Sequence, residues 1–235
     1  MSNDITNNAL YLVPTPIGNL DDITLRAIKV LSSVDVIACE DTRHTGNLLK
    51  LLSINYKRLE SYHEHNENTK NAQLLDLIES GKSVALVSDA GTPLISDPGY
   101  VIVKEAVKRG INVIELPGAS AGITALSASG FATNDFIFLG FPPQKKGRKT
   151  FLEKLKSLSS TMILYESPYR IVKLIEELIE FLGSERRICI ARELTKIHEE
   201  YIRGTTKECL KILESKQAIK GEFVVTIESQ NTKQD

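Results

Sequence analysis

The polar segment from Ser88 to Pro93, SDAGTP, carries the residue types of this sequence best suited to chemistry. It follows an apolar run, Val84–Val87, that is typical of a buried parallel strand. Downstream, Asp97 is expected to cap the next helix, with Pro98 at the first helical position. The pattern therefore predicts a rigid, acidic loop at the carboxyl end of a strand, where α/β sheets bind ligands. A capped acidic turn without a ligand is the alternative interpretation.

Similar polar clusters follow seven of the other eight expected strands. They read PTPIGN, CEDTR, YHEHN, PGAS, GFPP, YESPYR and RELTK. The expected strands cover residues 10–13, 34–38, 57–62, 84–87, 111–116, 136–139, 162–164, 187–191 and 223–227, and helical patterns separate most of them. The segment RELTKIHEEYIRGT, from Arg192 onward, is assigned to no strand.

This alternation of strands and helices predicts an α/β fold with helices on both faces of mostly parallel sheets. Right-handed crossovers would then place the carboxyl ends of all strands, and the polar clusters, at one edge of each sheet. We expect two αβα domains, at residues 1–118 and 119–235.

Composition limits the possible functions. The formal net charge of -1 provides no general attraction to nucleic acid, so any RNA contact must come from a local basic patch. Three widely spaced cysteines indicate reduced thiols, and no Cys/His spacing resembles a zinc site or another metal centre. The N-terminal residues lack the features of a signal peptide, and no apolar run is long enough to span a bilayer. We therefore expect a soluble cytoplasmic protein without a metal.

Phosphate-binding loops are missing from the sequence. It contains neither GxxxxGK[ST] nor a GxGxxG after the first strand, so the ligand is not expected to be held by its phosphates. Aspartates, strand-end carbonyls and small residues suit a ligand with hydroxyls, an amino group and a cationic centre. S-adenosylmethionine has all three.

Eight segments together resemble the tetrapyrrole methylase superfamily, and in particular its 16S rRNA (cytidine-2′-O)-methyltransferase branch. They are VPTPIGNLDDIT, CEDTRHTGNLL, YHEHN, VSDAGTPLISDPG, PGASA, LGFPP, YESPYR and ARELTKIHEE. The resemblance runs from about Leu10 to Ile227. It implies two αβα domains with S-adenosylmethionine in the cleft between them, a homodimer, and 16S rRNA or the small ribosomal subunit as substrate, methylated on a cytidine ribose of the decoding region. Relatives commonly continue into a small helical C-terminal domain, and we expect that domain to be absent from this chain.

The resemblance also implies a set of cofactor-binding residues. Those expected from the first domain are Pro14, Ser88, Asp89, Ala90, Gly91, Thr92 and Pro93, with Asp89 as the partner of a hydroxyl or ammonium group. Ser120 and Ala121 match the small pair after the PG turn. Tyr165, Ala191 and Gly221 are expected to close over the adenine.

Charged residues at the same edge are candidates for the chemical step. Methyl transfer to a ribose 2′-oxygen requires alignment and a base or a cation that stabilises the developing alkoxide. We favour Lys196 and Glu193 for this step, with Asp41 and Arg43 orienting the ribose phosphate; inter-domain salt bridges are the alternative. For the histidines a solvated loop position is favoured over a role as base. These histidines are His63, His65 and His198.

The basic run of Lys145, Lys146, Arg148 and Lys149 is the best candidate for an RNA phosphate track, although such runs are usually solvated linkers. Two other functions remain open at this point. One is methylation of a tetrapyrrole-like small molecule by the same fold. The other is RNA or ribosome binding without catalysis.

Overall fold

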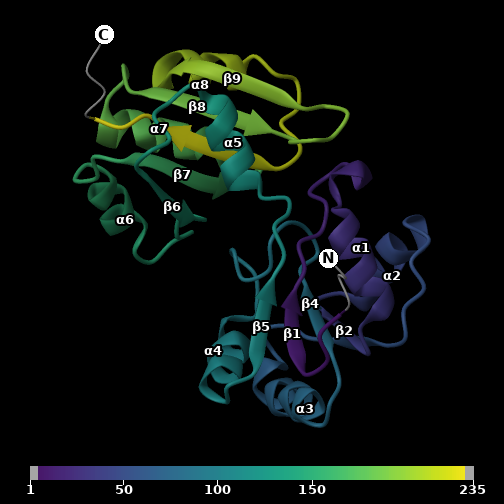
Figure 1. The fold of residues 1–235 in the computed structure, drawn as a ribbon. Coiled ribbons are helices and arrows are strands. Elements are labelled where there is room, and N and C mark those ends of the chain that lie inside the picture. The colour runs from purple at the N-terminus through teal and green to yellow at the C-terminus, as the bar shows by residue number, and fades with distance from the viewer. Residues whose placement is uncertain (1–4, 231–235) are drawn as a thin grey trace. The chain divides into compact units, whose positions relative to one another are not determined.

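The computed structural model describes residues 5–230, which form two compact units (Figure 1). The first unit ends at Ser120 and the second begins at Ala121. Within residues 5–230, no helix combines the length and the apolar character needed to cross a membrane.

The first unit is built on a parallel sheet with the strand order β3-β2-β4-β1-β5. Its strands are β1 (Ala9–Leu12), β2 (Val36–Cys39), β3 (Leu59–Ser61), β4 (Val84–Val87) and β5 (Asn112–Glu115). Its helices are the short 3-10 helix η1 (Leu20–Asp22), α1 (Leu25–Ser33), α2 (Thr42–Leu51), α3 (Glu67–Glu79) and α4 (Tyr100–Lys108). The prediction of an αβα unit with a parallel sheet is confirmed here.

Alternating side chains of this sheet enter two separate cores. Tyr11, Ile37 and Ala85 pack with α1 and α2, because successive residues of a strand face opposite sides. Leu10 and Leu86 pack with α3 and α4 on the other face. The central strand β4 is therefore buried along its whole length, as its continuous apolar run predicts.

The second unit is built on a sheet with the strand order β6-β7-β10-β8-β9. Its strands are β6 (Phe136–Gly140), β7 (Thr161–Glu166), β8 (Arg187–Arg192), β9 (Glu200–Thr205) and β10 (Phe223–Ile227). Its helices are α5 (Ala121–Ser129), α6 (Arg148–Leu155), α7 (Ile171–Leu182) and α8 (Thr206–Glu214). Apolar side chains of α6, α7 and α8 form one core with the sheet, while Gly122 of α5 lies against Ile163 and Phe138 of the opposite face.

The strand directions of this second sheet differ from the prediction. Only β6 and β7 pair in parallel, whereas β10 is antiparallel to β7 and β8, and β9 is antiparallel to β8. The cause is β9, which the sequence analysis missed because this edge strand carries a single buried side chain, Ile202. The chain reverses between β8 and β9, and β10 then follows β9 through α8 in the reversed direction.

The reversal leaves the polar loops together. Strands β6, β7 and β8 run in one direction and end at one edge, and β10 begins at that edge, since Phe223 pairs with both Glu166 and Arg192. The loops after β6, β7 and β8 and the segment before β10 therefore share one edge of the second sheet.

Candidate functional site

The exits of β1 and β4 are bound to each other by backbone hydrogen bonds. The amide of Thr15 donates to the carbonyl of Gly91 at 2.9 Å, and the amide of Gly91 donates back at 3.0 Å. The buried Thr15 hydroxyl also donates to the carbonyl of Ser88 at 3.0 Å. Gly91 has a φ of 81°, which favours glycine, and a Cβ there would approach Ile17 Cγ2 to 3.3 Å. The SDAGTP loop is thus fixed on the first loop of the chain.

The exit of β5 joins the same assembly. A Cβ on Gly118 would lie 2.4 Å from Cβ of Pro14, so only glycine fits this contact. The Thr92 hydroxyl donates to the carbonyl of Ala119 at 3.0 Å. The structure therefore brings together the loops of the first unit that hold predicted cofactor residues, namely Pro14, Ser88, Asp89, Ala90, Gly91, Thr92, Pro93 and Ser120.

Strained backbone occurs in two of the predicted site loops. Leu94 and Ser96 both have a φ of 71°, and Glu193 and Thr195 have φ values of 50° and 64°. Such left-handed conformations are costly for residues other than glycine and concentrate at functional sites. The strain marks the loop after β4 and the loop after β8.

Carboxylates gather beside the SDAGTP loop. Asp89 Oδ1 accepts a hydrogen bond from the amide of Asp41 at 3.3 Å. Burial, followed by the nearby charges of Glu40 and Asp89, raises the pKa of Asp97 to about 6. Burial and the charge of Asp89 also raise the pKa of Glu40. Mutual repulsion among these acids makes the loop a favourable place for a positively charged group.

Asp97 is a member of this cluster that the sequence analysis missed. We predicted it to cap α4, but α4 begins at Tyr100 and its N-cap is Gly99, with a φ of 128°. Two acidic turns, SDAGTP and SDPG, follow one strand within a few residues of each other. This spacing is the signal that could have identified Asp97 as a member of the cluster. No group of three or more His, Cys, Asp or Glu side chains within residues 5–230 is arranged to hold a metal ion.

Asp41 and Arg43 form an exposed pair at the start of α2. Arg43 Nη2 lies 2.9 Å from Asp41 Oδ2, and the arginine side chain is 91% exposed. The hydrogen bond from Arg43 lowers the pKa of Asp41 to about 2. Arg43 is therefore a permanently charged, accessible cation, while Asp41 is not a proton acceptor at neutral pH.

Glu193 and Lys196 come together as predicted, with a third residue, Glu222. Lys196 Nζ lies 3.0 Å from Glu193 Oε1 and 2.9 Å from Glu222 Oε2. Burial favours a lower pKa for Lys196, but hydrogen bonds to Glu222 and Glu193 outweigh it and raise the pKa. Lys196 therefore remains protonated, so it can act as a cation and not as a base.

The segment before β10 supports this trio. Glu193 Oε1 accepts a hydrogen bond from the amide of Glu222 at 3.0 Å. Burial favours a higher pKa for Glu193, but the bonds from Lys196 and Glu222 outweigh it and lower the pKa. Gly221, with a φ of 100°, lies so close to Glu193 that a Cβ would be 2.4 Å from its Cγ. The position of Gly221 beside β8 thus explains why it is glycine.

Tyr165 and Ala191 lie on the face of the second sheet opposite the α6–α8 core. The Tyr165 hydroxyl accepts a hydrogen bond from the amide of Gly122 at 3.0 Å, which ties β7 to the first turn of α5 beside Ala121. Its ring contacts Phe138 and Phe141 edge-on, at centroid distances of 5.0 and 5.5 Å. Ala191 is buried in β8. Both residues have structural contacts, and their contact with a cofactor stays a prediction.

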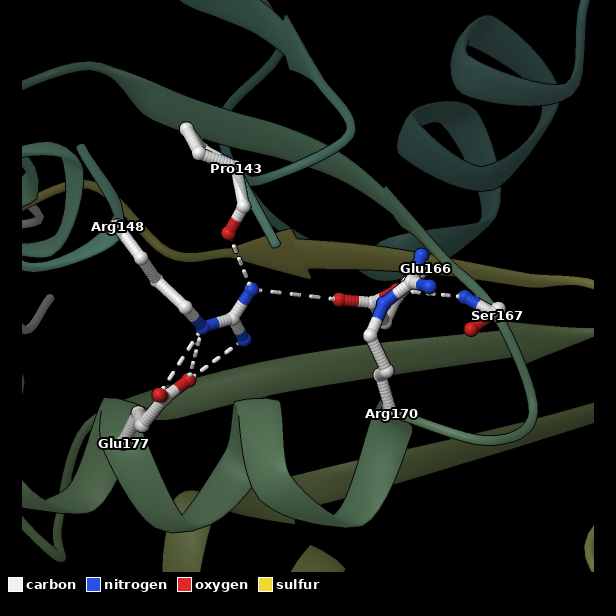
Figure 2. A network of polar contacts seen from close by, with 6 residues as sticks. All are labelled: Pro143, Arg148, Glu166, Ser167, Arg170 and Glu177. Carbon is white, nitrogen blue, oxygen red and sulfur yellow. Dashed lines mark hydrogen bonds and ion pairs between the residues drawn. The ribbon is translucent and has the colours of Figure 1, made fainter. Parts of the chain in front are cut away.

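The basic run of the second unit divides into two kinds of residue. Lys145, Lys146 and Lys149 are exposed. Arg148 is only 6% exposed and forms a bidentate ion pair with Glu177, from Nε to Oε1 at 3.0 Å and from Nη2 to Oε2 at 2.6 Å (Figure 2). The prediction of Arg148 as a phosphate contact does not fit this environment, because its guanidinium is already paired and shielded from solvent.

Figure 2 shows how Arg148 joins a larger network around Glu166. Arg148 Nη1 donates to the carbonyl of Pro143 at 2.9 Å and lies 3.9 Å from Glu166 Oε2. The other oxygen of Glu166 accepts hydrogen bonds from the Ser167 amide and from Arg170, each at 2.8 Å. This network fixes the loops after β6 and β7.

Comparison with curated proteins finds relatives that are about half identical over almost the whole chain. A protein named ribosomal RNA small subunit methyltransferase I from Halalkalibacterium halodurans is 50% identical over 225 residues, which is 95% of this chain and 77% of that protein. A protein of the same name from a Hydrogenobaculum species is 49% identical over 223 residues, covering 95% of this chain and 96% of that protein.

Solved structures share the fold at low sequence identity. The methyltransferase CobJ matches with a TM-score of 0.69 at 18% identity, covering 97% of this chain and 96% of that chain. Uroporphyrin-III-C-methyltransferase from Thermus thermophilus matches with a TM-score of 0.66 at 20% identity, covering 94% of each chain. These likenesses confirm the predicted fold class.

A family model decides the membership. The model described as tetrapyrrole (corrin/porphyrin) methylases matches residues 9–210, which include all the strand exits of the first unit and the exits of β6, β7 and β8. With curated relatives at about 50% identity, the resemblance inferred from the sequence is confirmed. This chain belongs to the tetrapyrrole methylase family.

Proposed function

We propose that this protein is an S-adenosylmethionine-dependent methyltransferase that methylates the ribose 2′-oxygen of a cytidine in the decoding region of 16S rRNA. The observation that carries the proposal is the 50% identity, over 95% of the chain, to a relative named ribosomal RNA small subunit methyltransferase I. The cytidine, the ribose oxygen and the decoding region rest on the resemblance of the motifs. A cytoplasmic location and a homodimer stay predictions.

The acidic loops of the first unit fit a cationic co-substrate. S-adenosylmethionine supplies the activated methyl group and carries a sulfonium, an ammonium and ribose hydroxyls. Asp89 and Asp97 offer carboxylates to the positive groups, and their proximity gives the loop a negative potential that a bound cation relieves. Gly91 and Gly118 permit the close packing of loops that places these residues together. The remaining assigned residues, Ala121, Tyr165, Ala191 and Gly221, belong to the second unit.

A solved structure of the same fold adds support for this co-substrate. Uroporphyrin-III C-methyltransferase from Thermus thermophilus, at 17% identity and a TM-score of 0.63, is described as complexed with S-adenyl homocysteine. That ligand is what S-adenosylmethionine becomes when its methyl group leaves. We infer the same class of ligand for the carboxylate-rich loops here.

The trio of Glu193, Lys196 and Glu222 suits stabilisation of an oxyanion. A ribose hydroxyl must lose its proton as the methyl group arrives, so negative charge develops on the 2′-oxygen. Lys196 is a fixed cation, held by two carboxylates at 3.0 and 2.9 Å, and can offset this charge. Arg43, exposed and always charged, is suited to hold a ribose phosphate. Despite burial, the pKa of Lys196 is raised by its hydrogen bonds, and the pKa values of Glu193 and Asp41 are lowered by theirs, which disfavours all three groups as the proton acceptor.

The experiment that tests this proposal is a map of ribose methylation in 16S rRNA from cells with and without the gene for this protein. We expect one 2′-O-methylcytidine in the decoding region to disappear with the gene and to return with a wild-type copy. An unchanged map, together with methylation of a corrinoid precursor by the purified protein, would assign the chain to a small-molecule substrate. An unchanged map without any methyl transfer would favour a non-catalytic ribosome-binding protein.

A further inference from the structure

A short turn after β7 holds an aromatic side chain in solvent. The carboxylate of buried Glu166 accepts hydrogen bonds from the amide of Ser167 and from Nε of Arg170, each at 2.8 Å. The amide of Arg170 also donates to the carbonyl of Ser167 at 3.1 Å, which closes the turn. Tyr169 lies at the tip and is 94% exposed. Both ends of the turn are therefore fixed on one carboxylate while the tyrosine ring faces water.

The loop after β6 lies beside this turn. Strands β6 and β7 are paired neighbours, and Arg148 at the end of the loop lies 3.9 Å from the same Glu166 (Figure 2). The loop carries the exposed cations Lys145 and Lys146 and the half-exposed ring of Phe141. Two adjacent loops with a common buried anchor thus present aromatic rings and lysines at one edge of the sheet.

This combination of groups fits an unpaired nucleotide. An aromatic ring stacks on the face of a base, and lysines follow the phosphates without choosing a sequence. Bases inside a duplex are stacked on each other and are inaccessible to such a ring, whereas loops and ends expose them. Single exposed aromatic residues are common on protein surfaces. Here the fixed turn, the second ring and the neighbouring cations distinguish Tyr169.

We propose that the loops 141–147 and 167–170 form a platform for single-stranded RNA. This proposal rests on the proposed function, in which RNA is the substrate. Tyr169 stacks on an unpaired base, and Lys145 and Lys146 contact the adjacent phosphates. Arg148 and Glu166 are positioning residues, because they hold the two loops and are themselves buried. The formal net charge of -1 supports this assignment, since RNA affinity must then come from a local surface.

The test compares Tyr169→Ala with Tyr169→Phe in the full chain. The probes are a fluorescein-labelled single-stranded RNA of about twelve nucleotides, which is the upper range of such sites, and the same RNA in a duplex. Tyr169→Ala should weaken single-strand binding by about 5- to 150-fold, as expected when one base loses its stacking partner. Tyr169→Phe should bind like the wild type, because the ring remains. Tyr56→Ala, which removes an exposed tyrosine of the first unit, is the control and should have no effect.

Salt dependence separates the roles of the ring and the lysines. Tyr169→Ala should leave the slope of log affinity against log salt unchanged, because a stacked ring releases no counterions. Lys145→Gln with Lys146→Gln should flatten the slope by about 0.7 for each phosphate that a lysine no longer neutralises. The thermal melting of Tyr169→Ala should match the wild type, since the ring is exposed.

The platform is overturned if the wild-type protein does not bind single-stranded RNA, or if Tyr169→Ala binds it with wild-type affinity. It is also overturned if Tyr169→Phe loses as much RNA affinity as Tyr169→Ala, or if Tyr169→Ala loses as much affinity for duplex RNA as for single-stranded RNA. A change of oligomeric state in Tyr169→Ala with unchanged RNA affinity would also overturn it, in favour of a second copy of this chain as the partner. The proposed function fails separately: a wild-type protein that binds single-stranded RNA through Tyr169 but methylates no rRNA would retain the platform and lose the activity.

Discussion

At the scale of single residues, the site is defined by how charges are paired. Lys196 is held between Glu193 and Glu222, and Arg43 is paired with Asp41, so both cations stay charged at neutral pH. The pKa values of Asp97 and Glu40 are raised, mainly by burial and next by the charges of neighbouring carboxylates. The first unit thus contains carboxylates that repel one another, and the second unit contains a lysine that stays protonated between two carboxylates.

Lys196→Met tests the role of this positive charge. If Lys196 stabilises the developing alkoxide, its loss should lower the single-turnover rate of methyl transfer by about a hundredfold or more, with little change in S-adenosylmethionine affinity. Rapid-quench kinetics and calorimetry measure the two quantities. Lys70→Met is the matched control, because Lys70 is also 30% exposed and paired with a glutamate. A preserved rate with weakened RNA affinity would make Lys196 a phosphate contact.

The pKa of Asp97 predicts how cofactor affinity depends on pH. With a pKa of about 6, Asp97 is largely protonated at pH 5 and ionised at pH 7.5. A positively charged ligand favours the ionised form, so affinity should rise with pH through 6 and level off above it, by at most tenfold per pH unit for one proton. Calorimetry at pH 5, 6 and 7.5 measures this. In Asp97→Asn the dependence should vanish; if it persists unchanged, another group causes it.

The same raised pKa has the opposite consequence for stability. The folded protein binds a proton at Asp97 more tightly than the unfolded chain, whose ordinary Asp value is 3.8. The contribution of Asp97 to the free energy of unfolding is therefore largest below pH 3.8 and is lost as the pH rises through 6. The carboxylate cluster destabilises the free protein at neutral pH, which is consistent with a site kept for a cation.

At the scale of elements, the basic run shows that residue type alone does not predict which side chains are exposed. Lys145, Lys146, Arg148 and Lys149 look alike as a string, but Arg148 is the first residue of α6. It shares the buried face of that helix with Leu152 and Leu155, four and seven positions later. This spacing could have revealed that Arg148 points inward. Its partner Glu177 on α7 could not have been predicted, because the pairing depends on how the two helices pack.

Arg148→Met tests the importance of the buried network. Removing the guanidinium leaves Glu177 without its partner and takes away one of the two cations near the buried Glu166, which keeps Arg170. The free energy of unfolding should therefore fall by about 3–5 kcal/mol. Urea denaturation measures the change. Lys149→Met, one residue away and paired only weakly at the surface, should change stability by less than about 0.5 kcal/mol. Equal small effects in both variants would mean that the network contributes little to stability.

The sheets show a second limit of sequence-based prediction. The first sheet was predicted correctly, because its central strands are continuous apolar runs followed by polar loops. The reversed direction of β10 was missed because β9, an edge strand with the sequence EYIRGT, lacks an apolar pattern. Local composition reveals buried strands well, but an edge strand pairs on one side only and needs little apolar surface.

At the scale of the whole molecule, two units present their polar loops at one edge of each sheet. In the first unit this follows from parallel strands alone. In the second unit the polar loops still share one edge although β9 and β10 run antiparallel, because these loops follow β6, β7 and β8. The recurrence of motifs at strand exits was therefore a reliable guide to fold and family. It was less reliable for individual roles, since Glu222 and Asp97 were missed and Arg148 was misplaced.

Methyl transfer by the purified protein from labelled S-adenosylmethionine to 16S rRNA, offered both as naked RNA and in the small ribosomal subunit, tests the proposed activity directly. Asp89→Ala removes one carboxylate of the SDAGTP loop and is the comparison variant, with circular dichroism to check that it folds. We expect label on the 2′-oxygen of one cytidine in the decoding region, and a loss of this label in Asp89→Ala that higher cofactor concentration partly restores. Label on a base, label only on a tetrapyrrole precursor, or full activity in Asp89→Ala would contradict this proposal.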